Sequence, residues 1–472
     1  MAFGFISIAT GIFTTYGAML TSSGPIGIWT WPVVVVGQLM VALIIGSLSA
    51  RIPVTGYIYQ WASRLTNPVF GWMMGWLGFT FLAVVLCAVD DTIPSTVLPV
   101  LFGYEGTAAN AWVITGLLIV AQAVVIALST KLTQRVNSFA VTIELFGMIA
   151  LVILLFAVGY FRNELNFADL FSTGTVPAEG YFSFGGLTNA GPWIMGTLLG
   201  AFTIVGFESA ANLAEETHQP EIVVPRAMWQ AIVSVGVLGM LFLIAVTALL
   251  GDPTTFKPSA TPIADVISHV LGPIVGNLLL VMVVISIYAC GQIIFLSATR
   301  LVWAMSRDKR FPGWRLWHRI HPTFHTPANA TILVAIVGQI ILAIFAHQTD
   351  ALFALFSAAT ILPVIIYAVT VWIYAAKRNR LPASRGFTLG SFELPVIAIA
   401  AAWIIFELAI FRDASFLVPW LYVAAMFALG ALYLAFIVFV DGVAKLKMPD
   451  LSSVDAKLDA DIEGAPLPAP AR

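Results

Sequence analysis

Stretches of about 20 apolar residues follow one another along almost the whole chain of 472 residues. A helix of roughly this length crosses the hydrocarbon core of a bilayer. Helices are expected because backbone polar groups cannot stay unpaired in hydrocarbon, and the sequence lacks the short alternating segments of a β-barrel. We therefore predict an all-α polytopic membrane protein of about twelve transmembrane helices, at 3–20, 29–50, 70–97, 111–129, 136–160, 192–213, 227–250, 273–304, 327–346, 352–376, 393–411 and 417–440.

Composition agrees with a chain that lies largely in lipid. Hydrophobic residues make up 60% and charged residues only 10% of the sequence, whereas a soluble protein carries about 25% charged residues. The net charge of -2 suggests no nucleic-acid partner. Cys87 and Cys290 both fall in apolar stretches, which favours helix packing over a disulfide. The first apolar stretch has no basic flank, so we expect no cleavable signal peptide.

The basic residues are distributed unevenly between alternate loops. With the N-terminus placed inside, the outer loops contain Arg162, Lys257 and Arg412, and the other 19 of the 22 Lys and Arg residues lie at the inner side. The positive-inside rule then predicts a plasma-membrane protein with both termini in the cytoplasm. The polar segment 441–472 ends in a run rich in Pro and Ala, which predicts a disordered cytoplasmic tail.

The first and sixth spans share an interruption. Each has a mid-span glycine, Gly11 or Gly206, with small or hydroxyl residues around it. Packing of small residues would explain either glycine alone. Corresponding interruptions five spans apart instead favour two inverted five-helix repeats, at 1–160 and 192–376, followed by two further helices at 393–440.

Such interruptions have a chemical use. An unwound turn exposes amide donors and carbonyl acceptors at half-membrane depth. The N-terminus of the following half-helix carries partial positive charge and suits a carboxylate. Carbonyl groups at the end of the preceding half-helix suit an ammonium group or a metal cation. Two breaks side by side could therefore bind an α- or ω-amino acid without a charged side chain.

Several strings of residues resemble the amino acid–polyamine–organocation (APC) transporter superfamily, and most closely its amino acid/choline and GABA permease branch. The likeness spans most of the chain, and the string in the sixth span is specific. The strings are Ala9-Thr10-Gly11-Ile12, Thr15-Tyr16-Gly17, Pro53-Val54-Thr55-Gly56-Tyr57-Ile58-Tyr59, Gly206-Phe207-Glu208-Ser209-Ala210-Ala211-Asn212-Leu213-Ala214-Glu215-Glu216-Thr217, Val224-Pro225-Arg226-Ala227-Met228 and Ser297-Ala298-Thr299-Arg300-Leu301-Val302-Trp303-Ala304-Met305-Ser306-Arg307-Asp308.

The resemblance implies inverted five-helix repeats, with alternating access around a central site. By similarity, the backbone of 9–11 would bind a substrate carboxylate, the backbone around Gly206 and Phe207 would bind its amine, and Phe202 would be an aromatic gate. The chain departs from the family at its start, because Met1 lies only about eight residues before the first break. We therefore expect the first half-helix to be shorter than in relatives by a turn or more.

Acidic residues inside the predicted spans are costly in a membrane and are therefore candidates for function. Glu144 lies in the fifth span, where some related transporters carry a lysine implicated in proton coupling. A desolvated glutamate can alternate between its neutral and charged forms, which makes Glu144 the candidate for proton coupling. The alternative is a structural acid that stays protonated or hydrogen-bonded. The one basic residue well inside a span is Arg300.

The other intramembrane acids have less specific interpretations. Glu208 and the adjacent Ser209 follow the second break and are candidates for contact with the substrate amine, although a structural hydrogen bond would also explain Glu208. Asp90 and Asp91 lie near the outer end of the third span, either at an outer vestibule or at a solvated helix end. Glu407 is interpreted as interfacial. The spacing of His, Cys and acidic residues predicts no metal site, and no nucleophile or phosphate-loop motif is found.

These features favour a secondary active transporter over an enzyme or a channel. We expect it to move an amino acid, a GABA-like ω-amino acid, a polyamine or a choline-like amine as a monomer or homodimer, without a cofactor and driven by a proton gradient. An exchanger remains an alternative, as does a sodium symporter that uses the hydroxyls of Ser286 and Ser297. A nutrient sensor on the same fold is a further alternative, although such sensors usually carry an extended signalling tail.

Overall fold

The structure is a computed structural model that describes residues 2–104, 107–186, 188–252, 261–345, 351–384, 386–442 and Leu446. Within these ranges all regular structure is helical. The predicted tail 441–472 lies outside the described residues, apart from its first two positions and Leu446.

Each of the predicted spans coincides with a helix or a run of short helices. Ten segments in the described ranges are long and apolar enough to cross a membrane. Nine of these segments contain one long helix each, and the tenth is the interrupted sixth span, Pro192–Glu215. The nine helices are α3 (Thr30–Arg51), α5 (Pro68–Thr92), α7 (Ala108–Leu128), α8 (Thr130–Phe161), α11 (Pro220–Thr247), α13 (Pro273–Arg307), α16 (Ala351–Lys377), α17 (Glu393–Ile410) and α18 (Leu417–Asp441). Helix α15 (Ala328–Phe345) is apolar but slightly shorter than these spans.

The remaining elements are short and cluster at the interrupted spans and at the helix ends. The first predicted span is divided into α1 and α2, and the sixth into α9, α10 and η4. The short elements are α1 (Ala2–Phe5), α2 (Ile8–Ser23), η1 (Pro25–Trp29), α4 (Tyr57–Leu65), η2 (Ile93–Val97), α6 (Leu98–Phe102), η3 (Asp169–Phe171), α9 (Pro192–Gly196), α10 (Leu198–Thr203), η4 (Phe207–Glu216), α12 (Pro262–Leu271), α14 (Trp314–Trp317), η5 (Arg378–Arg380), η6 (Gly390–Phe392) and η7 (Ala414–Phe416).

Helix ends follow local sequence signals. Asn67 caps α5 by accepting a hydrogen bond from the Phe70 amide at 2.8 Å, and Pro68 follows at the first helical position. Ser129 caps α8 in the same way through the Leu132 amide at 3.2 Å. Asn and Ser are preferred at these positions because their side chains satisfy an otherwise unpaired amide.

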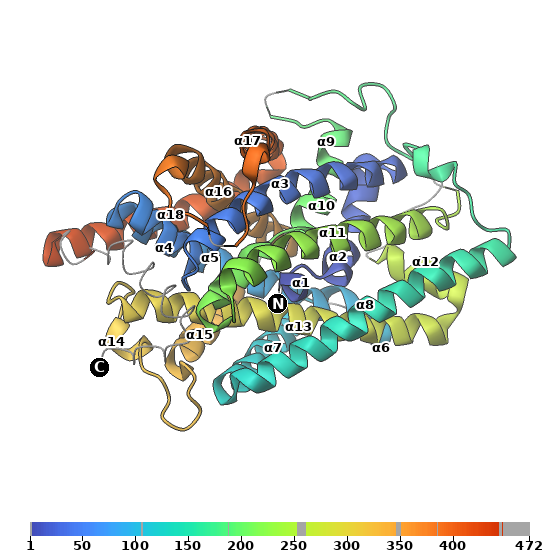
Figure 1. The fold of residues 1–472 in the computed structure, drawn as a ribbon. Helices are drawn as coiled ribbons and strands as arrows, with labels where there is room; N and C mark the ends of the chain where they lie inside the picture. Colours follow the sequence, from blue (N-terminus) through green and yellow to red (C-terminus); the bar gives the residue numbers. More distant parts are fainter. Residues whose placement is uncertain are drawn as a thin grey trace.

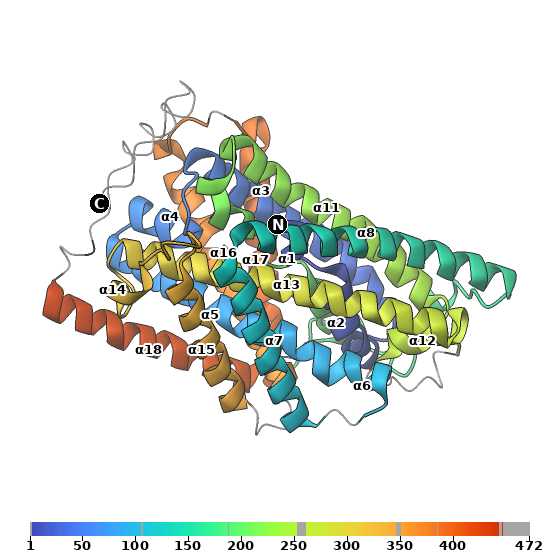
Figure 2. The ribbon, with the colours of Figure 1, turned by 90° about the horizontal axis from the view of Figure 1, so that it is seen from below.

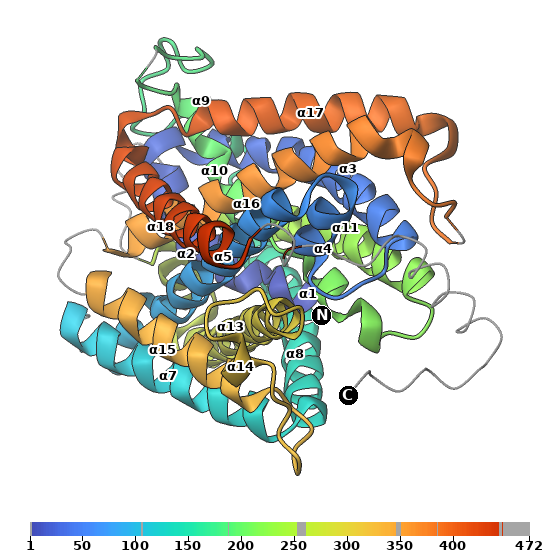
Figure 3. The ribbon, with the colours of Figure 1, turned by 90° about the vertical axis from the view of Figure 1, so that its left-hand side faces the viewer.

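The helices form one bundle with α1, α2, α5 and α13 in its interior (Figure 1). Seen from the side shown in Figure 3, α7 and α15 cover one flank and α3 and α17 the opposite one. Figure 2 shows α8 running alongside α13. In the most apolar window of the span that contains α5, 94% of residues are buried, against 11% for α18. The interior helices therefore position the site, and α18 offers its surface to lipid.

This architecture confirms the predicted fold class, an all-helical polytopic membrane protein whose first and sixth spans are interrupted. The division into inverted repeats at 1–160 and 192–376, with 393–440 as an addition, stays a prediction.

Candidate functional site

The first break lies earlier in the chain than the sequence analysis placed it. Helix α1 ends at Phe5, and α2 begins at Ile8. The residues expected at the break, Ala9, Thr10 and Gly11, instead form the first turn of α2. Ser7 explains this start, because its side chain accepts a hydrogen bond from the Thr10 amide at 3.1 Å and caps the helix.

The second break lies where it was predicted. Helix α10 ends at Thr203, and η4 begins at Phe207. Gly206 has a φ of +85°, a conformation that favours glycine. A Cβ atom at this position would lie 1.9 Å from Cε1 of Phe5. The two breaks therefore touch each other, with the last residue of α1 packed on the glycine that precedes η4.

The carboxyl group of Glu144, a residue of α8, lies at the N-terminus of α2. Its carboxylate Oε1 accepts hydrogen bonds from the Ser7 hydroxyl at 2.8 Å and from the Ala9 amide at 3.1 Å, and the side chain is buried. The amide of Gly11 donates to the carbonyl of Ser7 at 3.0 Å. The amides of Ala9, Thr10 and Gly11 thus all have acceptors within the protein.

Glu208 is held by a tyrosine of α16. The Tyr367 hydroxyl donates to Oε2 of Glu208 at 2.6 Å and accepts from the Gly206 amide at 3.1 Å. The rings of Phe207 and Tyr367 stack with centroids 5.1 Å apart. The buried hydroxyl of Ser209 has no hydrogen-bond partner among the described residues. Sequence analysis missed Tyr367, because its role depends on a partner about 160 residues away in the chain.

A small cavity of about 20 Å³ lies between the two breaks. This volume is near the minimum for a single water molecule. Of the predicted site residues, Thr10, Gly11 and Phe202 line it, together with Ser7 and Cys290. Ala9, Phe207, Glu208 and Ser209 are not part of the lining. Substrate binding by any of these residues remains a prediction.

A larger cavity of about 330 Å³ lies toward the end of the bundle at which α2 ends and α9 begins. Its lining includes Thr14, Ser357 and Phe416. This volume falls in the range of small-molecule sites. Phe202 lines both cavities and packs edge-on against Phe356, with ring centroids 4.3 Å apart. The Phe202 side chain therefore separates the larger cavity from the breaks.

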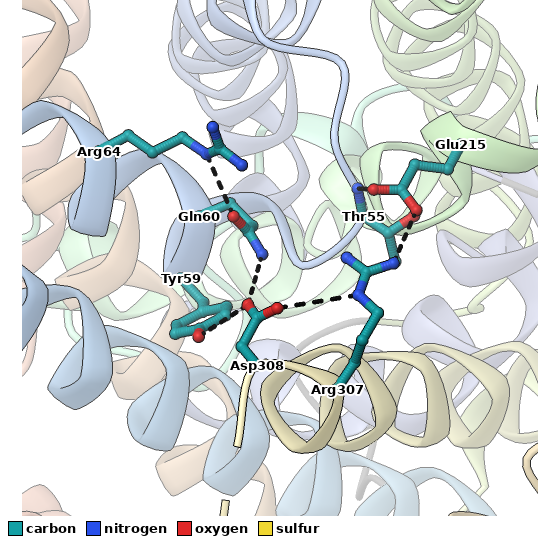
Figure 4. Close-up of polar contacts among 7 residues, drawn as sticks. All are labelled: Thr55, Tyr59, Gln60, Arg64, Glu215, Arg307 and Asp308. Carbon is teal, nitrogen blue, oxygen red and sulfur yellow. Dashed lines mark hydrogen bonds and ion pairs between the residues drawn. The ribbon is translucent and has the colours of Figure 1, made fainter. Parts of the chain in front are cut away.

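The opposite end of the bundle carries a group of polar and charged side chains that we call the charged network (Figure 4). It joins the segment just before α4, α4 itself, the end of η4 and the end of α13. Its members are Thr55, Tyr59, Gln60, Arg64, Glu215, Arg307 and Asp308.

Two acids organise the charged network. Glu215 accepts from the Thr55 amide at 3.3 Å and forms an ion pair with Arg307 at 3.1 Å. Asp308 accepts from the Tyr59 hydroxyl at 3.0 Å and from the Gln60 amide group at 3.1 Å. These contacts connect the sixth span with α4 and α13, so they hold this end of the bundle together.

Three other acids are buried, contrary to the simpler interpretations of the sequence. Asp90 and Asp91 are buried among helices rather than at a solvated helix end. Oδ1 of Asp90 accepts from Gln122 at 2.9 Å, and its Oδ2 has no hydrogen-bond partner in the part of the chain that the structure describes. Glu407 is fully buried rather than interfacial and accepts from Gln38 of α3 at 2.9 Å. These glutamine partners cannot be predicted from local sequence patterns, because they lie on helices distant in the chain.

Comparison with known proteins agrees with the earlier resemblance. A family model described as amino acid permease matches residues 1–445. The amino-acid permease BAT1 of Arabidopsis thaliana is 23% identical, covering 86% of this chain and 82% of the relative. An uncharacterized amino-acid permease of Schizosaccharomyces pombe is 26% identical, covering 87% and 77% respectively. The low-affinity putrescine importer PlaP of Escherichia coli is 26% identical over 64% of this chain and 63% of the importer. With its apolar helices and its two interrupted spans, this integral membrane protein belongs to the amino acid permease family.

Proposed function

We propose that this protein is a secondary active transporter that carries an amino acid or a related amine across the plasma membrane by alternating access. One observation carries the proposal. The larger cavity extends from one end of the bundle to Phe202, which separates it from the two breaks, whereas the charged network links α4, η4 and α13 at the other end. A transporter needs such a central site with access from one side at a time.

The proposed orientation follows from the distribution of basic residues. With both termini in the cytoplasm, the larger cavity faces outward and the charged network faces the cytoplasm. Phe202 is then the gate between the outer cavity and the substrate. We propose that the substrate contacts the surfaces of the two breaks, at Ala9, Thr10 and Gly11 on one side and at Gly206, Phe207, Glu208 and Ser209 on the other.

Glu144 is the proposed site of proton coupling. It is buried, and it contacts the start of α2, so a change in its protonation acts directly on the first break. Removal of its titratable group by Glu144→Gln should abolish substrate accumulation driven by a pH gradient in proteoliposomes. Glu407→Gln is the matched control, because Glu407 is equally buried but lies against α3. Undiminished pH-driven accumulation by Glu144→Gln would remove this residue from coupling.

The function is tested with purified protein against a panel of amino acids, GABA, polyamines and choline. A ligand that binds only the folded state raises the melting temperature by mass action. The same ligand should accumulate in proteoliposomes when an inward proton gradient is applied. Accumulation under a sodium gradient alone would identify sodium as the coupling ion, and uptake only against a preloaded amine would identify an exchanger. Failure of the whole panel to stabilise the folded protein would contradict amine transport.

A further inference from the structure

The amides of Ala9, Thr10 and Gly11 at the N-terminus of α2 all have acceptors within the protein and are not available to a substrate carboxylate. Helix N-termini bind anions because their first amides are unpaired and the helix dipole places partial positive charge there. Here Glu144 accepts from Ala9, and Ser7 accepts from Thr10 and Gly11. The anion site that an amino acid would use is therefore filled by a carboxylate of the protein itself.

We propose that the substrate is a cationic amine without a carboxylate, because Glu144 permanently takes the carboxylate position at the first break. This inference rests on the proposed transport function and narrows its substrate class. It differs from the expectation that the residues of this turn bind the carboxylate of an amino acid.

Charge at the site supports a cation. Among the described residues that line the two cavities, none is Lys, Arg or His. The buried carboxyl groups beside the breaks are those of Glu144 and Glu208, which lie behind the cavity lining. A substrate carboxylate would thus lie near two acids with no compensating base in the lining, and like charges repel strongly where water is excluded. An ammonium group would lie near groups of the opposite charge.

Displacement of Glu144 by a substrate carboxylate is unfavourable. The incoming carboxylate would gain the Ala9 amide and the Ser7 hydroxyl only by taking them from Glu144. The displaced side chain would then be a buried charged group without its partners. Protonation of Glu144 does not free the amides, because the carbonyl oxygen of a neutral carboxyl group still accepts hydrogen bonds. Proton coupling and exclusion of carboxylates are therefore compatible.

The first test uses the unaltered protein and pairs of ligands that differ only by a carboxylate. Suitable pairs are lysine with cadaverine, ornithine with putrescine, and leucine with isopentylamine. Binding is measured by thermal stabilisation and by competition in proteoliposomes. In at least one pair the amine should bind about tenfold or more tightly than its amino acid, the size expected for one lost charged hydrogen bond.

The second test removes the Glu144 carboxylate from the N-terminus of α2. Glu144→Ala frees the Ala9 amide and should bring the affinity for the amino acid up to or above that for its amine. Glu144→Gln keeps a carbonyl oxygen in place and should still exclude the amino acid. Glu407→Ala is the matched control, because it removes a carboxyl group of the same size from a fully buried helix position away from the breaks. It should leave the preference for the amine unchanged.

The outcomes separate the inference from the function on which it rests. If an amino acid binds the unaltered protein as tightly as its amine does, the inference is wrong and the transport function stands. If neither member of any pair binds, the proposed function fails, and the inference with it. If Glu144→Ala folds and still rejects amino acids while it binds the amine, Glu144 is not the group that excludes them.

Discussion

The Tyr367 hydroxyl lies between Gly206 and Glu208, accepting from the amide of one at 3.1 Å and donating to the carboxylate of the other at 2.6 Å. One side chain of α16 thus fixes both ends of the turn between the second break and η4. The turn is irregular backbone within the bundle, where an unpaired polar group is costly. Tyr367 supplies the hydrogen bonds that the helix itself cannot supply there.

Tyr367→Phe should therefore destabilise the protein by about 1–3 kcal/mol, because it leaves the Gly206 amide and the Glu208 carboxylate without this partner. It should also lower the maximal rate of transport, since the second break loses its fixed shape. Tyr374→Phe is the matched control on the same helix, where the hydroxyl contacts Ser47 and Glu393. If both variants lower the transport rate equally for the same loss of stability, Tyr367 has no specific role at the second break.

Gly206→Ala should be far more damaging than Gly251→Ala. The two glycines have similar left-handed conformations, with φ of +85° and +79°. Each alanine costs about 1–2 kcal/mol in backbone strain. Among the described residues, none lies within 4 Å of a Cβ at Gly251, whereas a Cβ at Gly206 would collide with Phe5, which adds about 1–3 kcal/mol of overpacking. Thermal unfolding of the purified variants measures the difference, and equal losses would contradict the contact with Phe5.

Phe202→Ala should expose Cys290 to reagents from the larger cavity. Cys290 lines the small cavity, and the Phe202 side chain separates it from the larger one. In a Cys87→Ser background, the rate of alkylation of Cys290 by a small water-soluble thiol reagent should rise several-fold. Phe242→Ala is the control, because this ring is fully buried and packs against Phe13 without lining either cavity. An unchanged rate would mean that Phe202 is not the barrier.

Arg307→Ala should shift the protein toward conformations that are open at the charged network. The ion pair with Glu215 is partly exposed, so its loss is worth about 0.5–1 kcal/mol and should change the populations about two- to fivefold. Distances between spin labels on α4 and on the loop after η4 report the change. Arg315→Ala removes a cation from α14, outside the network, and should leave these distances unaltered. Unaltered distances in Arg307→Ala itself would show that the network does not hold this end closed.

Asp413 should make stability dependent on pH in the acid range. Partial burial raises the pKa of Asp413, but hydrogen bonds from the Ser415 and Ala190 amides outweigh it, and the pKa lies below its ordinary value of 3.8. The ionised carboxylate therefore stabilises the folded state above the unfolded pKa, and this contribution is lost as the pH falls through the folded pKa.

Asp413→Asn should lower the free energy of unfolding by about 1 kcal/mol at neutral pH, a value reduced for the partial exposure of the carboxylate. The difference from the unaltered protein should shrink below about pH 4. Thermal unfolding at several pH values checks this. The control is Glu179→Gln, at an exposed acid in the loop between η3 and α9. A difference that does not change with pH would show that the charge of Asp413 is not what stabilises the loop.

The apolar spans and the second break could be predicted because their signals are local. Twenty apolar residues predict a helix whatever lies beside them. A glycine among small residues, followed by Glu208, predicts an irregular turn at half-membrane depth. The first break lies a few residues earlier than Gly11 predicts, because Ser7 caps α2 and starts the helix before that glycine. The pair Ser7 and Thr10 carries that signal in the sequence itself.

The partners of the buried acids could not be predicted. Glu144 contacts residues about 135 positions away, and Glu407 contacts Gln38 from the other end of the chain. Periodicity places each side chain on a helix face but does not specify which helix packs against it. For the same reason the contacts of Tyr367 with the second break could not be predicted. Nor could the position of Glu144 at the N-terminus of α2, which depends on how α8 packs against that helix.

The packing of Phe5 on Gly206 has a consequence for how the protein moves. Helix α1 has only four residues, too few to be stable without packing. The ring of Phe5, the last residue of α1, packs directly on Gly206. A movement of α1 would therefore remove this contact and expose the turn that precedes η4. A displacement of either interrupted span should therefore disturb the packing of the other, which couples their conformations at this one contact.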